Sequence, residues 1–473
     1  MRRVLPFMAL AAAVLGGCVD LAPNYRRPAA PIPGSFPTGP AYAAASAAPQ
    51  PLVGWRDFFL DPKLKAVIGE ALANNRDLRV AVANIAAARA QYHVQRADLF
   101  PKIDAQAAAT YGQEPTRVVA GAANQRLYSL SAGASAFQLD LFGKVRNLSR
   151  SAQEQYFATR QARDAAQITL VSEVAADYLA LGSDRALLEV AEDTLRSATE
   201  SLEVIKGRLA AGVDSELDVS QAQTIVQQAR FDLARLTTQV AQDRNALDLV
   251  VGAPVDDDLS PSGVGDPVVV LKRLPAVVDS GVLLDRPDVL RAEDQLRAAN
   301  ANIGAARAAF FPSISLTGSG GQTSLALSTL FKGGSGAWSF APTVSQTIFD
   351  AGANQGNLNY AKAQRDISLA NYEKAIQTAF REVADALAER GTIDEQLAAQ
   401  EALTDAAATA LRLSTTRYEQ GSDTYLNVLV AQRVLYSARQ TLVATRLAQA
   451  NNLVTLYAAL GGGLNAPVAL AHR

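Results

Sequence analysis

Two long stretches of the chain repeat apolar residues at alternating steps of three and four positions. The first contains Leu188, Ala191, Leu195, Ala198, Leu202, Ile205 and Leu209, and it resumes from Val219 to Val250 with Asp243 as its one polar member. The second runs from Val428 to Ala459. Such steps are typical of the a and d positions of a coiled coil. Residues 116–253 and 343–466 also lack proline, which disrupts a helix interior, so we predict very long antiparallel helices.

A glycine followed by short polar residues interrupts each stretch. These residues are Gly212, Asp214 and Ser215 in the first stretch and Gly421, Ser422 and Asp423 in the second. Glycine readily adopts the left-handed conformation that ends a helix, and Ser or Asp caps the helix that follows. We therefore predict a tight helix-to-helix turn at each glycine. The helix leading to the first turn would run from about Lys144 to Leu209, which is ~100 Å at about 1.5 Å per residue.

Four shorter segments alternate apolar and polar residues instead, at about 101–112, 127–139, 312–322 and 337–348. In the second of them, Tyr128, Leu130, Ala132, Ala134 and Ala136 alternate with serines and a glycine. This alternation predicts β-strands, joined in pairs by the polar loops 113–126 and 323–335. Such strands suit a membrane β-barrel, with Tyr111, Tyr128 and Trp338 at its interfaces. The alternative is a pair of soluble hairpins packed on a helical bundle.

The second half of the chain repeats the first at an offset of 209 to 211 residues. Arg208, Gly212, Asp214, Leu217, Val219, Ala222 and Gln223 recur as Arg417, Gly421, Asp423, Leu426, Val428, Ala431 and Gln432. An internal duplication therefore organises the fold. We place the first repeat at 63–254 and the second at 285–463, each with a helix, two strands and a long helical hairpin. Residues 255–284 would form a linker and residues 464–473 a C-terminal tail.

The N-terminus has the pattern of a secretory signal peptide. Arg2 and Arg3 precede an apolar run, and small residues lead to Cys18, the only cysteine. The pattern resembles a bacterial lipobox, which implies that residues 1–17 are removed and that acyl chains are attached to Cys18. Residues 18–62 would then be a lipid-anchored, extended segment rich in proline. The alternative is an ordinary signal peptide followed by an unmodified thiol.

Composition argues against several classes of function. The formal net charge is −2 and no run is rich in Lys or Arg, so nucleic acid is not an expected partner. The two histidines, His93 and His472, lack the partners of a zinc or acid–base site, so we expect no enzyme, metal or cofactor. After residue 20 no run approaches the roughly 18 apolar residues that a spanning helix needs.

Four strands cannot close a membrane barrel alone, because open sheet edges in lipid leave backbone groups without hydrogen-bond partners. Three copies would supply about twelve strands. The predicted fold is thus membrane α+β: each chain contributes four strands to a trimeric barrel, which continues into a tunnel of long antiparallel coiled-coil helices. From the helices alone, an antiparallel coiled coil of a fibrous or signalling protein is the alternative.

At this point the residues resemble the outer-membrane efflux factors, the TolC-like family, and in particular its lipoprotein branch. The resemblance covers nearly the whole chain. It rests on Cys18 followed by Tyr25 and Pro28, on Trp55, Phe58 and Asp61, on Ala97–Pro101 and its repeat, on Asp140–Gly143 and Ile348–Gly352, and on the paired turn glycines. It implies a homotrimeric duct in the bacterial outer membrane that extends into the periplasm. Such a duct docks with a periplasmic adaptor and an inner-membrane transporter to export drugs or other small solutes.

The resemblance also implies a gate at the periplasmic entrance. By position after Gly421, the family's constriction falls on Leu426, Val430 and Arg433. Several members carry an acid where this chain has Val430, so the resemblance implies a gate that is more apolar than acidic. Without the family, Leu426 would be read as a core position and Arg433 as part of a solvated helix face.

Charged residues and turn glycines complete the predicted sites. Arg433 is expected to pair with a carboxylate of a neighbouring hairpin, such as Asp214 or Asp218, while Asp423 supplies negative potential. The expected adaptor-docking residues at the two turns are Arg208, Gly212, Arg417 and Gly421. Two other functions stay open: a duct for protein secretion, and a lipid-anchored periplasmic coiled-coil tether that does not conduct.

Overall fold

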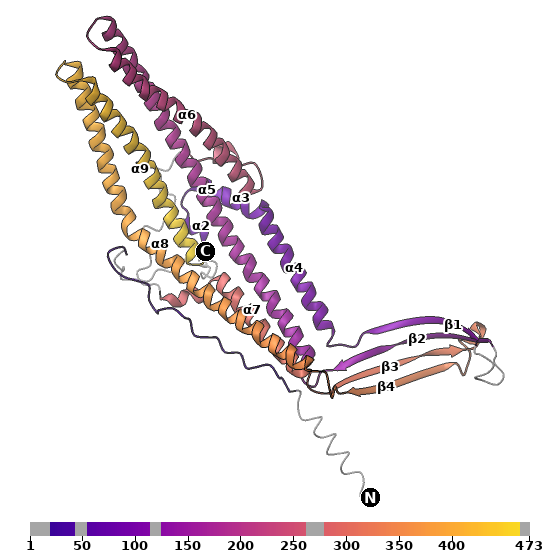
Figure 1. Ribbon diagram of the computed structural model, residues 1–473. Coiled ribbons are helices and arrows are strands. Elements are labelled where there is room, and N and C mark those ends of the chain that lie inside the picture. Colours follow the sequence, from indigo (N-terminus) through magenta and orange to yellow (C-terminus); the bar gives the residue numbers. More distant parts are fainter. Residues whose placement is uncertain (1–18, 43–53, 114–123, 262–278, 464–473) are drawn as a thin grey trace, which may run out of the picture. The chain divides into compact units, whose positions relative to one another are not determined.

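The computed structural model describes residues 19–42, 54–113, 124–261 and 279–463 (Figure 1). Cys18, the predicted signal peptide and the predicted tail lie outside these residues. The helices are α2 (Trp55–Phe58), α3 (Pro62–Asn74), α4 (Arg76–Ala97), α5 (Lys144–Ala210), α6 (Glu216–Val251), α7 (Pro287–Ala308), α8 (Ala353–Glu419) and α9 (Tyr425–Ala459). The strands are β1 (Ile103–Gln113), β2 (Asn124–Leu139), β3 (Ser313–Ser324) and β4 (Gly336–Ser345), and short 3-10 turns are η1 (Asp257–Leu259), η2 (Ser280–Asp285) and η3 (Leu327–Thr329). No helix in this part of the chain is long and apolar enough to cross a membrane.

The internal duplication is visible in the lengths of matching elements. Helices α4 and α7 have 22 residues each, and α5 and α8 have 67 each. The chain forms two compact units, and each contains segments of both repeats. One unit holds the strands with Asn84–Arg160, Arg291–Tyr372 and the N-terminal residues up to Ala29. The other holds Ala30–Ala83, Gln161–Leu290 and the residues from Glu373 onward.

Two predicted segments differ from the structure in their secondary structure. The first repeat opens with two helices, α3 and α4, rather than one, because Asn75 breaks the chain direction between them. Its Oδ1 accepts a hydrogen bond from Leu78 N at 2.8 Å and its Nδ2 donates to Val250 O at 2.7 Å, so the side chain caps α4 and ties it to the end of α6. The N-terminal segment is also not extended throughout, since it contains α2 and the first residue of α3.

The four strands form one antiparallel sheet in the order β1-β2-β3-β4. Cross-strand partners point to the same face, and the register collects apolar side chains on one face and Ser and Thr on the other. The apolar face is uncovered: Trp338 is 83% exposed, Phe340 61% and Val344 66%. Soluble hairpins packed on a bundle would bury this face, so the structure does not favour that alternative.

A β-bulge in β2 keeps the two faces distinct. The pairing with β3 shifts between Ala134 and Phe137, and Ala136 has a positive φ of 52°. Ala136 therefore does not continue the alternation predicted for it; its backbone N–H donates to Thr317 Oγ1 at 3.0 Å. The extra residue reverses the alternation, so that Phe137 and Leu139 lie on the apolar face opposite Leu316 and Ile314.

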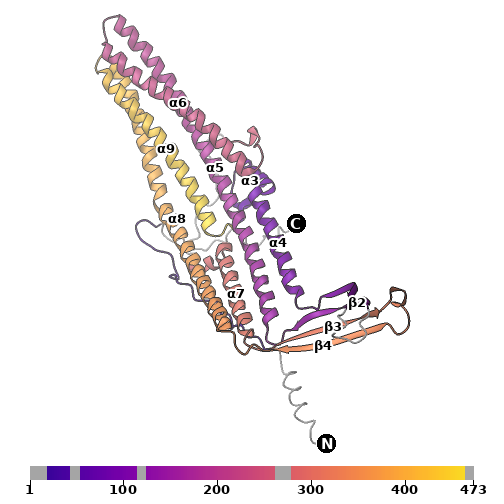
Figure 2. The same ribbon diagram turned by 45° about the vertical axis from the view of Figure 1, so that its right-hand side comes forward.

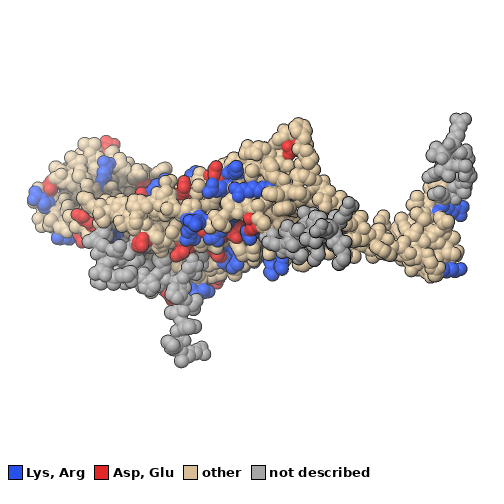
Figure 3. Space-filling view, turned by 90° about the horizontal axis from the view of Figure 1, so that it is seen from below, with Lys and Arg blue, Asp and Glu red and all other residues tan. Residues whose placement is uncertain are grey.

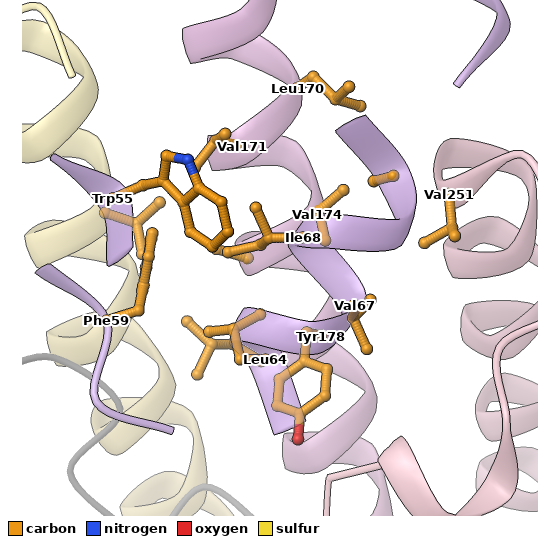
Figure 4. Close-up of a cluster of buried hydrophobic side chains, with 14 of the residues drawn as sticks. Trp55, Phe59, Leu64, Val67, Ile68, Leu170, Val171, Val174, Tyr178 and Val251 are labelled. Atoms are coloured by element: carbon orange, nitrogen blue, oxygen red, sulfur yellow. The ribbon is translucent and has the colours of Figure 1, made fainter. Parts of the chain in front are cut away.

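The aromatic block before the first long helix forms a core (Figure 4). Trp55, Phe58 and Phe59 are buried together with Leu64, Val67 and Ile68 of α3 against Leu170, Val171, Val174 and Tyr178 of α5. The Phe58 ring stacks on Tyr457 of α9 at a centroid distance of 4.3 Å. Asp61 caps α3 by accepting from Lys63 N at 2.8 Å and accepts from the Tyr178 hydroxyl at 3.1 Å. Asp61 thus fixes α3 on α5.

The heptad positions form the seams of the two helical hairpins. Ala191, Ala198, Leu202 and Ile205 are buried, whereas Leu209 is 36% exposed. The prediction that Leu209 continues the buried seam was therefore wrong, because α5 ends one residue later and the chain turns away. Asp243, the polar member, accepts from Gln239 Nε2 at 2.8 Å through Oδ1. Its Oδ2 is buried and has no hydrogen-bond partner among the described residues.

Asp184 on α5 faces this carboxyl group and is predicted to make stability depend on pH. Burial, followed by the neighbouring carboxyl group of Asp243, raises the pKa of Asp184 from 3.8 to about 6. Because the folded state binds this proton more tightly than the unfolded state, folding loses stability as pH rises from about 4 to about 6. We expect Asp184→Asn to raise the melting temperature at about pH 8 and to change it little at about pH 4. Circular dichroism of the helices measures both values.

An exposed acid on the same helix provides the control. Glu189→Gln removes a carboxylate from the solvated face of α5 and is expected to leave the melting temperature unchanged at both pH values. An equal effect of Asp184→Asn at both pH values would contradict the proton-linked role of the pair.

Candidate gate and docking surface

The two helix-to-helix turns have the same geometry. Gly212, between α5 and α6, has a φ of 75°, and Gly421, between α8 and α9, has a φ of 70°. A Cβ at either position would meet no atom within 4 Å, so each glycine is required by backbone conformation and not by close packing. Both turns belong to the same compact unit. The predicted turns are confirmed.

The caps that follow the two glycines differ. Ser215 begins α6 with a capping box: Asp218 N donates to Ser215 Oγ at 3.3 Å, and Ser215 N donates to Asp218 Oδ2 at 3.0 Å. In the second turn Ser422 and Asp423 do not cap α9, contrary to the prediction. The N-cap residue is Thr424, whose side chain makes no capping hydrogen bond. The Asp423 carboxylate instead accepts hydrogen bonds from Thr424 N and Asn427 Nδ2 and pairs with Arg417.

Each turn contains an arginine–aspartate pair six residues apart. Arg208 Nε lies 3.0 Å from Asp214 Oδ2, and Arg417 Nε lies 3.2 Å from Asp423 Oδ2. Hydrogen bonds from Asn427, from a backbone N–H and from Arg417 lower the pKa of Asp423, so this group is charged at neutral pH. Its charge is nevertheless offset by Arg417. Asp423 is therefore a weaker source of negative potential than the sequence alone suggests.

Tyr418 links the second hairpin to the first and was not identified from the sequence. Its hydroxyl donates to Asp214 Oδ2, and the Arg208 guanidinium lies 4.6 Å from its ring centroid. Burial and the bond to Asp214 raise the pKa of Tyr418. In the duplication Tyr418 occupies the position that Leu209 has in the first repeat. A tyrosine in place of an apolar residue at the end of a heptad run could have indicated this contact, because its buried hydroxyl group needs a hydrogen-bond partner.

Leu426 and Val430 lie on the exposed face of α9 rather than in its core. They are 50% and 52% exposed, and Val434 continues the same face at 49%. Spacings of four residues place all three on one side of the helix. The side of the helix that carries Tyr425, Val428 and Leu429 is buried between the two hairpins. An apolar stripe thus faces away from the core beside the turn.

Arg433 is exposed and contacts the first hairpin. Its Nη2 donates to Thr224 Oγ1 on α6 at 3.0 Å. Asp214 and Asp218, the predicted partners of Arg433, are engaged by Arg208 and by the Ser215 capping box within this chain. Arg433 therefore joins the hairpins through a hydroxyl group, and an ion pair with Asp214 or Asp218 of another copy stays a prediction.

The described residues at the two turns form exposed apolar surfaces and ion pairs. No group of three or more His, Cys, Asp or Glu side chains in the described part of the chain could hold a metal ion. His93 lies exposed on α4, away from any such group.

Comparisons with known proteins agree on one family. The sequence profile described as "Outer membrane efflux protein" matches residues 67–253 and 280–462. The solvent efflux pump outer membrane protein SrpC of Pseudomonas putida is 47% identical over 469 residues, covering 98% of each chain. The cation efflux system protein CusC of Escherichia coli O6:H1 is 41% identical over 461 residues, again covering 98% of each chain. The open-state MtrE outer membrane channel of Neisseria gonorrhoeae aligns with a TM-score of 0.86 at 37% identity, covering 94% of this chain and 98% of that one.

Proposed function

Because the chain belongs to the outer membrane efflux protein family, and is thus the outer-membrane channel component of an efflux system, we propose that three copies close into one duct. The observation that carries this proposal is the sheet. Its apolar face is exposed, and β1 and β4 are its two edges. Lipid would cover the apolar face, and β4 of one copy would pair with β1 of the next. Three sheets of 4 strands would give about twelve strands, enough for a closed barrel.

The long helices would continue this barrel as a periplasmic tunnel. A periplasmic adaptor and an inner-membrane transporter would complete a tripartite pump, docking at the two hairpin turns. Arg417, with 63% of its side chain exposed, is better placed for docking than Arg208, which is committed to Asp214 and Tyr418. Gly212 and Gly421 would shape the turns that the adaptor contacts. Acyl chains on Cys18 would anchor the N-terminus in the outer membrane.

The relatives' names indicate the class of cargo. SrpC is named for solvent efflux and CusC for cation efflux. In this chain the stripe of Leu426, Val430 and Val434 would form apolar rings when three copies meet, and an apolar constriction resists wetting. We infer small, uncharged or amphiphilic organic solutes as cargo in preference to metal cations.

Purification from outer membranes tests the proposed duct. The expected results are a trimer by mass, a sheet that resists heat in detergent and discrete conductance steps in planar bilayers. A monomer without conductance would indicate a tether. Conductance that appears only after a secretion apparatus and its protein cargo are added would indicate a duct for protein secretion. Mass spectrometry of the N-terminal peptide tests for acyl chains on Cys18.

Val430→Asp is expected to increase the preference of the channel for cations. Three copies would place a ring of carboxylates on the exposed face of α9, where the parent has an apolar ring. The reversal potential across a salt gradient measures the preference. Val430→Asn is the matched control, since it is similar in size and polarity but carries no charge. Equal reversal potentials for the two variants would show that Val430 does not line the ion path.

A further inference from the structure

The loop between β3 and β4 exposes several large apolar side chains. Leu325 is 72% exposed, Leu327 64% and Phe331 71%. β3 follows α7 and β4 precedes α8, so this loop lies at the end of the sheet away from those helices (Figure 2). In a membrane barrel with periplasmic helices, this end is the cell-surface end. Aqueous surface loops are normally polar, so three such side chains need a partner.

The loop is held in a defined conformation. η3 forms its first turn, and Thr329 Oγ1 donates to Ala326 O at 2.9 Å. Ser335 Oγ donates to Leu330 O at 2.7 Å, and Leu330 itself is 5% exposed. One apolar side chain is thus buried under the loop while three point outward. Their exposure follows from this fold of the loop and not from a lack of structure.

Hydrogen bonds draw the loop toward the apolar face of the sheet. Ser324 Oγ and Thr329 Oγ1 lie 2.5 Å apart, and Ser335 Oγ also lies within hydrogen-bond distance of Gln322 Oε1. Gln322 and Ser324 alternate in register with Gly320, the partner of Trp338, and so belong to the apolar face. The two strand side chains that hold the loop are therefore on the side that would face lipid.

We propose that this loop is a lipid-binding surface of the outer leaflet. Leu325, Leu327 and Phe331 extend the apolar belt beyond Trp338 and enter the acyl-chain boundary, while exposed Lys332 binds a lipid phosphate. On the face seen in Figure 3, the described residues at the end of the sheet far from the helices show basic side chains and no acidic ones. The inference rests on the proposed barrel, because only a barrel brings this loop to the membrane surface. A second copy would meet the edges β1 and β4 rather than the apolar face, so lipid is the better partner.

Tryptophan fluorescence in proteoliposomes tests the proposal. Trp55 and Trp338 are the protein's two tryptophans, and phenylalanine at both gives a silent background. In this background Phe331→Trp is expected to be quenched strongly by phosphatidylethanolamine–phosphatidylglycerol vesicles with brominated acyl chains, and weakly by aqueous iodide. Quenching by iodide alone would overturn the proposal. Weak quenching by both agents, together with a higher conductance of the Phe331→Ser variant, would also overturn the proposal. Those two results would show that the loop covers the pore.

Two further positions separate failure of the loop proposal from failure of the barrel. Phe340→Trp reports the apolar face and should respond to brominated lipid, whereas Thr343→Trp reports the polar face and should respond to iodide. If both behave so and Phe331→Trp does not, only the loop proposal fails. If Phe340→Trp also responds to iodide alone, the barrel fails. Lys332→Glu added to Phe331→Trp is expected to reduce quenching by lipid, and unchanged quenching would remove Lys332 from the site.

Discussion

Replacing Arg433 with glutamate is expected to raise the resting conductance of the trimeric channel several-fold. Arg433 joins α9 to α6 through a 3.0 Å hydrogen bond to Thr224 Oγ1, beside the exposed stripe that begins at Leu426. Glutamate cannot reproduce the guanidinium donor at this distance, and three such carboxylates near one axis would repel one another. The hairpins would then separate at the entrance. Single-channel recording in planar bilayers, at fixed salt, measures the change.

Two matched variants define the cause of the Arg433→Glu effect. Arg412→Glu makes the same charge change on an exposed position of α8 and is expected to leave the conductance at the parent value. Arg433→Lys keeps the positive charge but not the planar guanidinium, and an intermediate conductance is expected. If Arg433→Glu conducts like the parent, the contact between α9 and α6 does not hold the entrance closed.

Glu293→Ala is expected to destabilise the unit that contains the sheet by about 2 kcal/mol. Glu293 is 1% exposed on α7; its Oε1 accepts from the Tyr25 hydroxyl at 3.1 Å and from Arg297 Nη2 at 2.6 Å, and its Oε2 from Arg27 Nε at 3.0 Å. Alanine would remove the carboxylate that Arg27 and Arg297 share, while Arg297 would keep the more distant Asp294 at 3.7 Å. Both arginines keep about 40% of their side chains exposed, which limits the cost below that of a fully buried pair. Thermal unfolding in detergent measures the loss.

The loss of stability caused by Glu293→Ala is also expected to depend on pH. Burial alone would raise the pKa of Glu293, but Arg27 and Arg297 outweigh it, and the pKa lies below the ordinary 4.5. The stabilisation is therefore present above about pH 4.5 and is lost as pH falls through the lowered value. Asp385→Ala, which removes an exposed partner of Arg381, is the control and should change stability by less than about 0.5 kcal/mol. Equal losses for the two variants would contradict the structural role of Glu293.

The sequence by itself determined the elements of this protein and their duplication. Apolar steps of three and four predicted α5, α6 and α9, and the alternation of apolar and polar residues predicted four strands to within a few residues. Glycine with short polar residues predicted both turns. These features depend on side chains close to one another along the chain, and their periods of 3.6 and 2 residues are visible without a fold. Family resemblance then supplied the channel function, which the comparisons confirm.

Only the tertiary structure decided which distant residues meet. The bulge at Ala136, the break at Asn75 and the bond from Tyr418 to Asp214 all depend on a partner in another element. The same holds for Leu426, since a heptad pattern alone does not say whether a neighbouring helix covers an apolar residue. A side chain's local spacing predicts the face of its helix or strand, but the free energy of a hydrogen bond or a buried contact depends on what the folded chain places opposite that face.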